Sequence, residues 1–286
     1  MQRIKLFSDS TCDLPQAEIT AMDVDIIPLL ITIKDVEYLD GVTIDSNLLF
    51  QKVAETKSLP QTASPSVQTY YEAFQPYVEK GIPVLYIGLS SKLSSSYEHA
   101  KLAAEMFPAG MVAVIDSLNL CGGIGALVRM AYRFQQEGKS LPEIVTLLEQ
   151  IAPHYKLFFT MDSLKYLRKG GRCTLGQLIA SNTLNIKPII QMSKDGLSVW
   201  KKARGKKNAL KLMLDEIERD KEKILFDEIH VATIYGDYAE RNQLKADLQE
   251  RTGITVYHEY DIGCVIASHC GEGTIGFGYF LKDSLF

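Results

Sequence analysis

The sequence of 286 residues has no hydrophobic run long enough to cross a membrane. Its longest apolar stretch covers 26–31 and contains Pro28, whereas a membrane-spanning helix needs about 20 apolar residues. The N-terminal residues lack the apolar core of a signal peptide. Lysine and arginine total 31 against 35 aspartates and glutamates, so no positive excess favours nucleic acid. We therefore expect a cytoplasmic protein that binds no nucleic acid and makes at most transient contact with a membrane.

Common metal, disulfide and nucleotide motifs are also missing. The five cysteines are widely spaced and form no C-x-x-C pair, which argues against a disulfide framework or a zinc knuckle. Cys264, His269 and Cys270 lie near one another in sequence, but buried thiols beside a histidine are the commoner arrangement. The phosphate-binding loop G-x-x-x-x-G-K-[ST] and the hydrolase elbow G-x-S-x-G do not occur, and the glycine-rich run 122–125 does not match the dinucleotide motif G-x-G-x-x-G. We therefore expect neither a metal nor a cofactor.

The chain is long enough for about two domains, and its pattern changes near the middle. Apolar strands expected over 3–7, 24–30, 84–89, 111–116 and 157–160 alternate with helices, which indicates a parallel sheet covered on both faces. An extended segment is expected over 31–40. After a basic turn over 164–172 and a helix over 175–181, two strands are joined by the hairpin turn 193–196, and an extended segment is expected over the C-terminal residues 271–281. The sequence predicts an α/β fold: a parallel-sheet N-terminal domain (1–160) and an α+β C-terminal domain (161–286).

Two clusters of hydroxyl side chains follow predicted strands. One covers 62–66, where Ser64 suits a helix cap before Pro65; the other covers 90–97, where Ser95 and Glu98 fit a capping box. The N-terminus of a helix carries unpaired N–H groups that bind a carboxylate or phosphate, and ligands of open α/β sheets bind at the carboxyl ends of strands. Helix capping alone is the competing interpretation. Asp9 and Asp13 also have two possible roles: they either bind a metal ion or serve as capping and loop residues.

Two further features have both a structural and a functional interpretation. His269 lies in a glycine-rich turn, where it either donates to an anion or is a satisfied loop side chain. Between 201 and 211 there are six basic residues and no acidic one. This basic corner is either a solvated surface or a docking site for an acidic or phosphate-bearing partner.

Several motifs together give the chain a clear family resemblance. They include Ser8–Asp9–Ser10, the segments 60–66 and 90–97, the run 166–172, and the turn His269-x-Gly271-x-Gly273. In this order the sequence resembles the DegV family, the bacterial fatty-acid-binding B subunits of fatty acid kinase. The match covers essentially the whole chain. Ser95 stands where the family usually has glycine, and Glu272 where it usually has proline.

The resemblance implies a fold and a set of site residues. Two α/β domains would hold an acyl chain between them, and Thr62 and Ser94 would donate to its carboxylate. His269 would join them, with Ser95 and Arg172 in the head-group region.

The expected function is that of a carrier rather than an enzyme. It would bind a long-chain fatty acid and present the carboxylate to a separate ATP-dependent fatty acid kinase subunit for acyl phosphate formation, with Arg204, Lys202 and Lys206 as the docking residues. One alternative is a serine-dependent acyl hydrolase that uses Ser94 with His269. A lipid-sensing regulatory protein that binds its partner through the basic corner is another.

Overall fold

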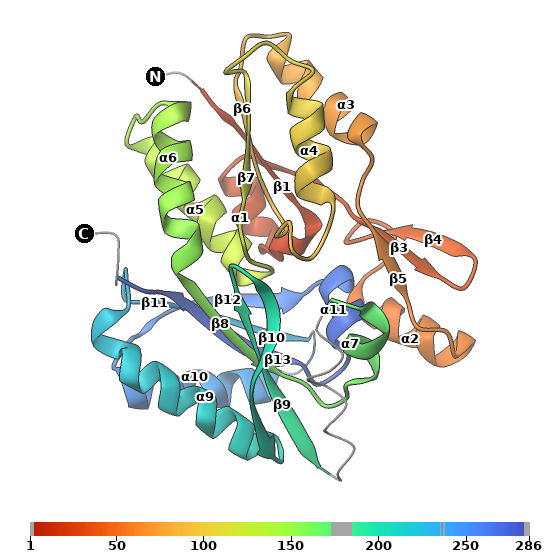
Figure 1. The fold of residues 1–286 in the computed structure, drawn as a ribbon, viewed down its shortest axis with the longest axis vertical. Coiled ribbons are helices and arrows are strands. Elements are labelled where there is room, and N and C mark those ends of the chain that lie inside the picture. The colour runs from red at the N-terminus through yellow and green to blue at the C-terminus, as the bar shows by residue number, and fades with distance from the viewer. Residues whose placement is uncertain (1–2, 173–184, 235, 237, 283–286) are drawn as a thin grey trace.

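A computed structural model describes residues 3–172, 185–234, 236 and 238–282. The helix predicted over 175–181 and Cys173 lie outside the described residues. The chain forms two large sheets, one above the other in Figure 1, and a small sheet that projects to one side. In the described ranges, no helix combines the length and apolarity needed to cross a bilayer.

The N-terminal half contains a four-stranded parallel sheet with helices on both faces (Figure 1). Its elements are β1 (Lys5–Asp9), η1 (Ser10–Cys12), α1 (Gln16–Ala21), β2 (Val24–Ile27), α3 (Val67–Val78), β6 (Val84–Gly88), α4 (Ser96–Ala104), β7 (Val112–Asp116), α5 (Gly122–Gln136), α6 (Leu141–Ile151) and η2 (Ala152–His154). The strand order is β2-β1-β6-β7. Every residue of β1 and β6 is buried, as expected for central strands covered on both faces.

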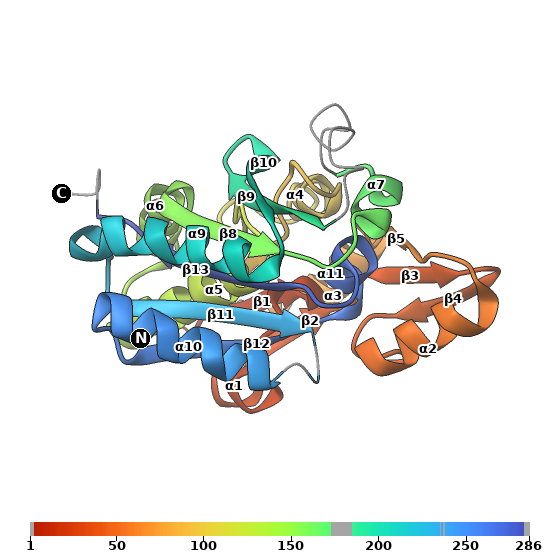
Figure 2. The same cartoon turned by 90° about the horizontal axis from the view of Figure 1, so that it is seen from below.

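A six-stranded mixed sheet dominates the C-terminal half (Figure 2). Its elements are β8 (Tyr155–Thr160), α7 (Lys165–Gly170), β9 (Ile186–Ser193), β10 (Gly196–Arg204), α9 (Lys206–Asp220), η4 (Lys221–Lys223), β11 (Glu228–Ile234), α10 (Tyr238–Thr252), β12 (Val256–Ile262), α11 (Cys264–Cys270) and β13 (Ile275–Phe280). The order is β10-β9-β8-β13-β11-β12, and only the β11–β12 pair is parallel. Helices α9 and α10 pack on one face. The other face meets α5, which also contacts β1 and β6 and so lies between the two sheets.

A small antiparallel sheet replaces the single extended segment predicted over 31–40. It consists of β3 (Leu30–Ile33), β4 (Val36–Leu39) and β5 (Gln61–Ala63), with α2 (Ser46–Thr56) beside it (Figure 1). The chain reverses between β3 and β4 at Lys34, whose φ is 55°. That left-handed conformation lets a short turn close the hairpin. β5 then pairs with β3 so that Thr62 lies opposite Ile31.

The predicted fold class is confirmed, with a parallel sheet in the first half and a mixed sheet in the second. The division at residue 160 stays a prediction. β8 lies just before it and hydrogen-bonds with β9 and β13, which come after it. Two short helices differ from the prediction: α7 replaces the turn expected over 164–172, and α11 lies directly before the C-terminal extended segment.

Candidate functional site

A cavity of about 260 Å³ lies between the two halves of the chain. Apolar side chains form most of its wall: Leu29, Ala63, Leu89, Leu93, Leu120, Leu197, Val265, Ile266 and Cys270. Its polar wall is formed by Thr62, Ser64, Ser94, Ser95, Arg172 and His269. All five residues predicted for the head-group region therefore line one cavity. Arg172 is the charged side chain among the described residues that line it.

At this cavity, Thr62 and His269 form a hydrogen bond between two segments that lie 207 residues apart in the sequence. The Oγ1 atom of Thr62 lies 2.8 Å from Nε2 of His269. Burial, and next the charge of Arg172, lowers the pKa of His269 from 6.5 to about 4. The imidazole is therefore neutral at neutral pH and presents one donor and one acceptor. A Cβ atom on Gly170 would stand 2.2 Å from its Nδ1, so only glycine at that position leaves room for the ring.

The position of His269 depends on two carboxylates that the sequence did not single out for this role. Asp40 accepts hydrogen bonds from the backbone N–H groups of Cys264 (3.0 Å) and Val265 (3.4 Å) at the start of α11. Asp13 accepts from the N–H of Gly263 (3.1 Å). These N–H groups have no partner within the helix, so both carboxylates cap α11 from outside. Burial raises the pKa of Asp40 and of Asp13.

Ser94 lines the cavity from another part of the chain, the turn between β6 and α4. Its Oγ lies 2.9 Å from Oγ of Ser96 and accepts from the Ser96 backbone N–H at 3.2 Å. Ser94 therefore takes the capping contact that the sequence assigned to Ser95. The Ser95 side chain makes no cap hydrogen bond and is exposed at the cavity. The predicted capping box with Glu98 was wrong because Ser95, with φ −77° and ψ 2°, lacks the extended backbone of a capping serine.

The other hydroxyl cluster shows a similar shift. α3 begins two residues later than predicted, and its cap is Ser66, whose side chain accepts from the Thr69 N–H at 3.1 Å. Ser64 instead lies 3.2 Å from Nδ1 of His99 and faces the cavity. The cap predicted at Ser64 was therefore wrong, and its hydroxyl belongs to the polar wall.

Arg172 links two segments that border the polar wall of the cavity. Its guanidinium donates to the carbonyl oxygen of Gly170 at 2.7 Å and to that of Leu93 at 3.4 Å. The first contact lies beside His269 and the second beside Ser94. The side chain is exposed, so its charge is screened by solvent and acts at the mouth of the cavity.

For Asp9 and Asp13 the sequence left two roles open, metal binding or helix capping. Both carboxylates make capping contacts in the structure. Asp9 caps η1 by accepting from the Thr11 N–H (3.0 Å) and also accepts from Tyr86 (2.8 Å) and the Leu89 N–H (2.9 Å). These contacts fix the end of β1 beside the cavity residue Leu89.

The basic corner lies at the far end of β10 from the cavity. Leu197 lines the cavity, and Arg204 follows seven residues later on the same strand, which corresponds to about 23 Å at about 3.3 Å per residue. Lys202 and Arg204 are exposed, whereas Lys206 forms an ion pair with Glu240 at 2.6 Å. Arg204 is therefore too distant to contact a ligand in the cavity.

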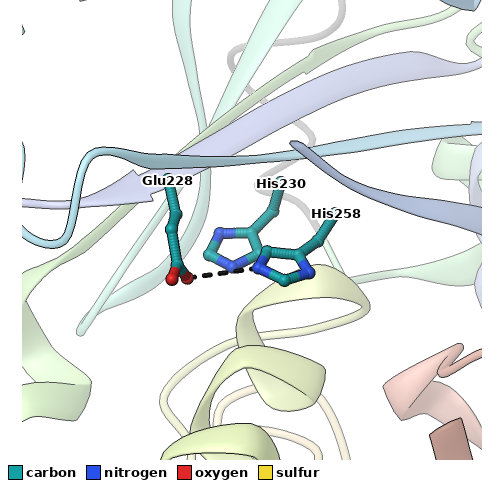
Figure 3. Close-up of side chains that lie close together, drawn as sticks. All are labelled: Glu228, His230 and His258. Carbon is teal, nitrogen blue, oxygen red and sulfur yellow. Dashed lines mark hydrogen bonds and ion pairs between the residues drawn. The ribbon is translucent and has the colours of Figure 1, made fainter. Parts of the chain in front are cut away.

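Another titratable cluster, Glu228, His230 and His258, lies between the second sheet and α5 (Figure 3). One ligand-type atom of each residue lies within 4.8 Å of the others. One oxygen of Glu228 accepts from Arg133 at 2.9 Å and the other lies 3.2 Å from Nε2 of His258. With both oxygens partnered, the cluster is an ion-pair network that joins α5 to β11 and β12.

Comparison with known proteins places this arrangement in a family. The model of a family described as an uncharacterised protein of the DegV family matches residues 3–282. This chain belongs to the DegV family. A DegV domain-containing protein of Clostridium acetobutylicum is 32% identical over 276 residues, which is 96% of this chain and 98% of that protein.

Solved DegV structures have the same fold. The structure described as fatty acid binding of a DegV family protein from Thermus thermophilus has a TM-score of 0.89 and 31% identity, and the match covers 98% of this chain and 99% of that one. A stearic acid-binding protein from Eubacterium ventriosum has a TM-score of 0.89 and 27% identity, with 99% and 100% covered. Both share the layered arrangement in which this DegV chain encloses its cavity.

Proposed function

We propose that this DegV protein binds a long-chain fatty acid in the cavity between its two halves. The observation that carries the proposal is the distribution of polarity in one cavity: Thr62, Ser94 and His269 contribute neutral polar groups to its wall, and most of the remaining wall is apolar. The carboxylate would lie among these three residues, with Ser95 and Arg172 beside it. The fatty acids bound by the Thermus and Eubacterium relatives support the same ligand class.

The acyl tail would supply most of the affinity. Burial contributes about 0.8 kcal/mol for each methylene, so a chain of about 15 methylenes contributes about 12 kcal/mol before the costs of association and ordering. The head-group residues then need only to orient the carboxylate and satisfy its oxygens. Hydroxyl and imidazole donors do this without neutralising the carboxylate as strongly as a buried lysine ion pair would.

The protein would act as a carrier rather than as the catalyst. A carboxylate oxygen would attack the terminal phosphorus of ATP held by a separate kinase subunit, forming the acyl phosphate and releasing ADP. Neutral donors favour this step because they leave electron density on the attacking oxygen. The exposed basic corner, with Lys202 and Arg204, would dock the acidic surface of that subunit. Lys206, already paired with Glu240, would contribute less.

The double variant Thr62→Ala and Ser94→Ala tests the head-group assignment. Loss of two hydrogen bonds to a charged carboxylate, at about 1.5 kcal/mol or more each, should weaken fatty acid binding at least about a hundredfold. Native mass spectrometry and competition with a fluorescent fatty acid give the occupancy and the Kd. The control variant, Thr20→Ala with Ser91→Ala, removes two hydroxyls outside the cavity and should bind normally. Undiminished fatty acid in the double variant would show that the carboxylate lies elsewhere.

Charge reversal tests the docking assignment separately. Arg204→Glu should abolish kinase-coupled acyl phosphate formation while the Kd for fatty acid stays unchanged, because Arg204 lies far from the cavity. Lys80→Glu, an equal charge change at another exposed position, is the control. Normal turnover by the Arg204 variant would refute the docking role.

A serine hydrolase is less consistent with the geometry. Such an enzyme needs a hydrogen bond between the nucleophile and its base, but Oγ of Ser94 contacts Ser96, and Nε2 of His269 contacts Thr62. Hydrolysis of acyl esters that disappears in Ser94→Ala would favour the hydrolase. A purely regulatory protein would bind a partner through the basic corner without supporting acyl phosphate formation.

A further inference from the structure

A second, smaller cavity of about 20 Å³ adjoins the first at its apolar side. Leu120, Ile266 and Cys270 line both cavities. The remaining wall of the small cavity is formed by Cys121, Gly122, Tyr155, Leu157, Phe159, His230, Ala232, Ile262, Thr274 and Gly276. On the proposed function, the distal part of the acyl chain would point toward this small cavity.

Two polar atoms at the small cavity have no hydrogen-bond partner. They are Oη of Tyr155 and Nδ1 of His230, on side chains that are 5% and 4% exposed. A buried polar atom without a partner destabilises the fold, because it has lost its hydrogen bonds to water. An acyl tail made only of methylenes would leave both atoms without a partner, so the observed lining is unfavourable for a wholly apolar tail.

The protonation of both residues suits a neutral oxygen. Burial raises the pKa of Tyr155 well above its ordinary value, so its hydroxyl remains a donor. Burial, and next the charge of His258, lowers the pKa of His230 to about 3, so its imidazole is neutral at neutral pH. The pair therefore offers both donor and acceptor atoms without a net charge.

Neighbouring residues hold the two side chains in place. A Cβ atom on Gly278 would stand 2.4 Å from Oη of Tyr155, so the hydroxyl packs directly against the backbone of β13. The His230 ring lies against that of His258 with centroids 5.2 Å apart and an interplanar angle of 17° (Figure 3). The Glu228–His258 contact anchors the outer ring. Such support gives fixed polar positions, which a specificity pocket requires.

We propose that this small cavity accepts an oxygen carried by the acyl chain far from its carboxylate, held by Tyr155 and His230. This inference rests on the proposed function and names a narrower ligand class: long-chain fatty acids with a hydroxyl or keto group in the distal half. The volume of about 20 Å³ is close to what one water molecule needs, so a hydroxyl or carbonyl fits and a second carboxylate does not.

Binding of octadecanoic acid and its mono-hydroxylated forms to the full chain tests the inference. The hydroxyl is moved one carbon at a time along the distal half of the acid, and each Kd is measured by competition. One position, with at most its immediate neighbours, should bind about tenfold more tightly than octadecanoic acid, which corresponds to about 1.4 kcal/mol. Tyr155→Phe should erase this preference. Tyr71→Phe, which removes a hydroxyl from a ring stacked on Phe107 at the outer helices, should keep it.

Three results would overturn the inference. If octadecanoic acid binds and no hydroxylated form binds more tightly, a trapped water satisfies the two polar atoms, and the proposed function still stands. A preference that persists in Tyr155→Phe would place the oxygen elsewhere. Failure of every fatty acid to bind would overturn both this inference and the proposed function. The comparison among ligands uses the unaltered protein, so it decides the matter even if the Tyr155 variant does not fold.

Discussion

Acidification should destabilise this protein in a window set by His269. Its pKa is about 4 in the fold against 6.5 for an ordinary histidine. Above pH 6.5 the imidazole is neutral in both the folded and the unfolded chain, so it contributes no pH dependence. Between pH 6.5 and 4 the unfolded chain binds a proton that the folded chain does not, and the free energy of unfolding falls. The difference of 2.5 between these pKa values corresponds to about 3 kcal/mol at about 1.4 kcal/mol per unit.

Replacement by glutamine isolates this effect. His269→Gln keeps a polar side chain beside Thr62 but cannot titrate, so its stability should fall less between pH 6.5 and 4 than that of the unaltered protein. Urea unfolding, followed by circular dichroism at a series of pH values, measures both curves. His230 also has a lowered pKa, but it is present in both proteins, so its effect cancels in the difference. Parallel curves over this window would refute the assignment of a buried, neutral imidazole, as would an NMR titration of His269 with a midpoint near 6.5.

Three further perturbations test the support of the site. Gly170→Ala places a methyl group 2.2 Å from Nδ1 of His269 and should weaken fatty acid binding at least tenfold in a competition assay; Gly171→Asn, at a left-handed position with open space around it, should not. Asp40→Ala removes the outside cap of α11 and should lower the free energy of unfolding by about 1–3 kcal/mol, with partial recovery in Asp40→Asn; an unchanged urea midpoint would contradict the capping role. The buried Cys270 thiol, whose pKa burial raises to about 12, should react with maleimide only after unfolding, as followed by peptide mass spectrometry, and rapid labelling of the native protein would contradict its burial.

The sequence predicted the large parallel sheet because its central strands carry a strong signal. β6 is a short apolar run, and every residue of β6 and of β1 is buried, which is the pattern that parallel sheets produce. The small sheet was missed because β3 and β4 have four residues each and β4 is exposed or half-buried along its length. Strands this short and this exposed lack a periodic pattern.

Helix α11 was missed for the opposite reason. Six of its seven residues are buried, so it has no polar face and gives no amphipathic signal. Its cap is also nonlocal, because Asp40 lies more than two hundred residues away in sequence. No local pattern reveals a carboxylate that acts across that separation. The family motifs, by contrast, predicted five head-group residues, and all five line the cavity.

One small structural unit fixes both members of the Thr62–His269 pair. Thr62 is held by the pairing of β5 with β3, and His269 is held through α11 by Asp40, which directly follows β4. Ser94 comes instead from the turn that follows β6 of the first large sheet, and the apolar walls of the two cavities include residues of the second. A carboxylate bound by all three residues would therefore bridge the small sheet and the first large sheet. On the proposed function, substitutions of the wall residues that lie outside β5 and α11, such as Leu93, Leu120 and Leu197, would change the acyl chain that fits while the Thr62–His269 contact stays in place.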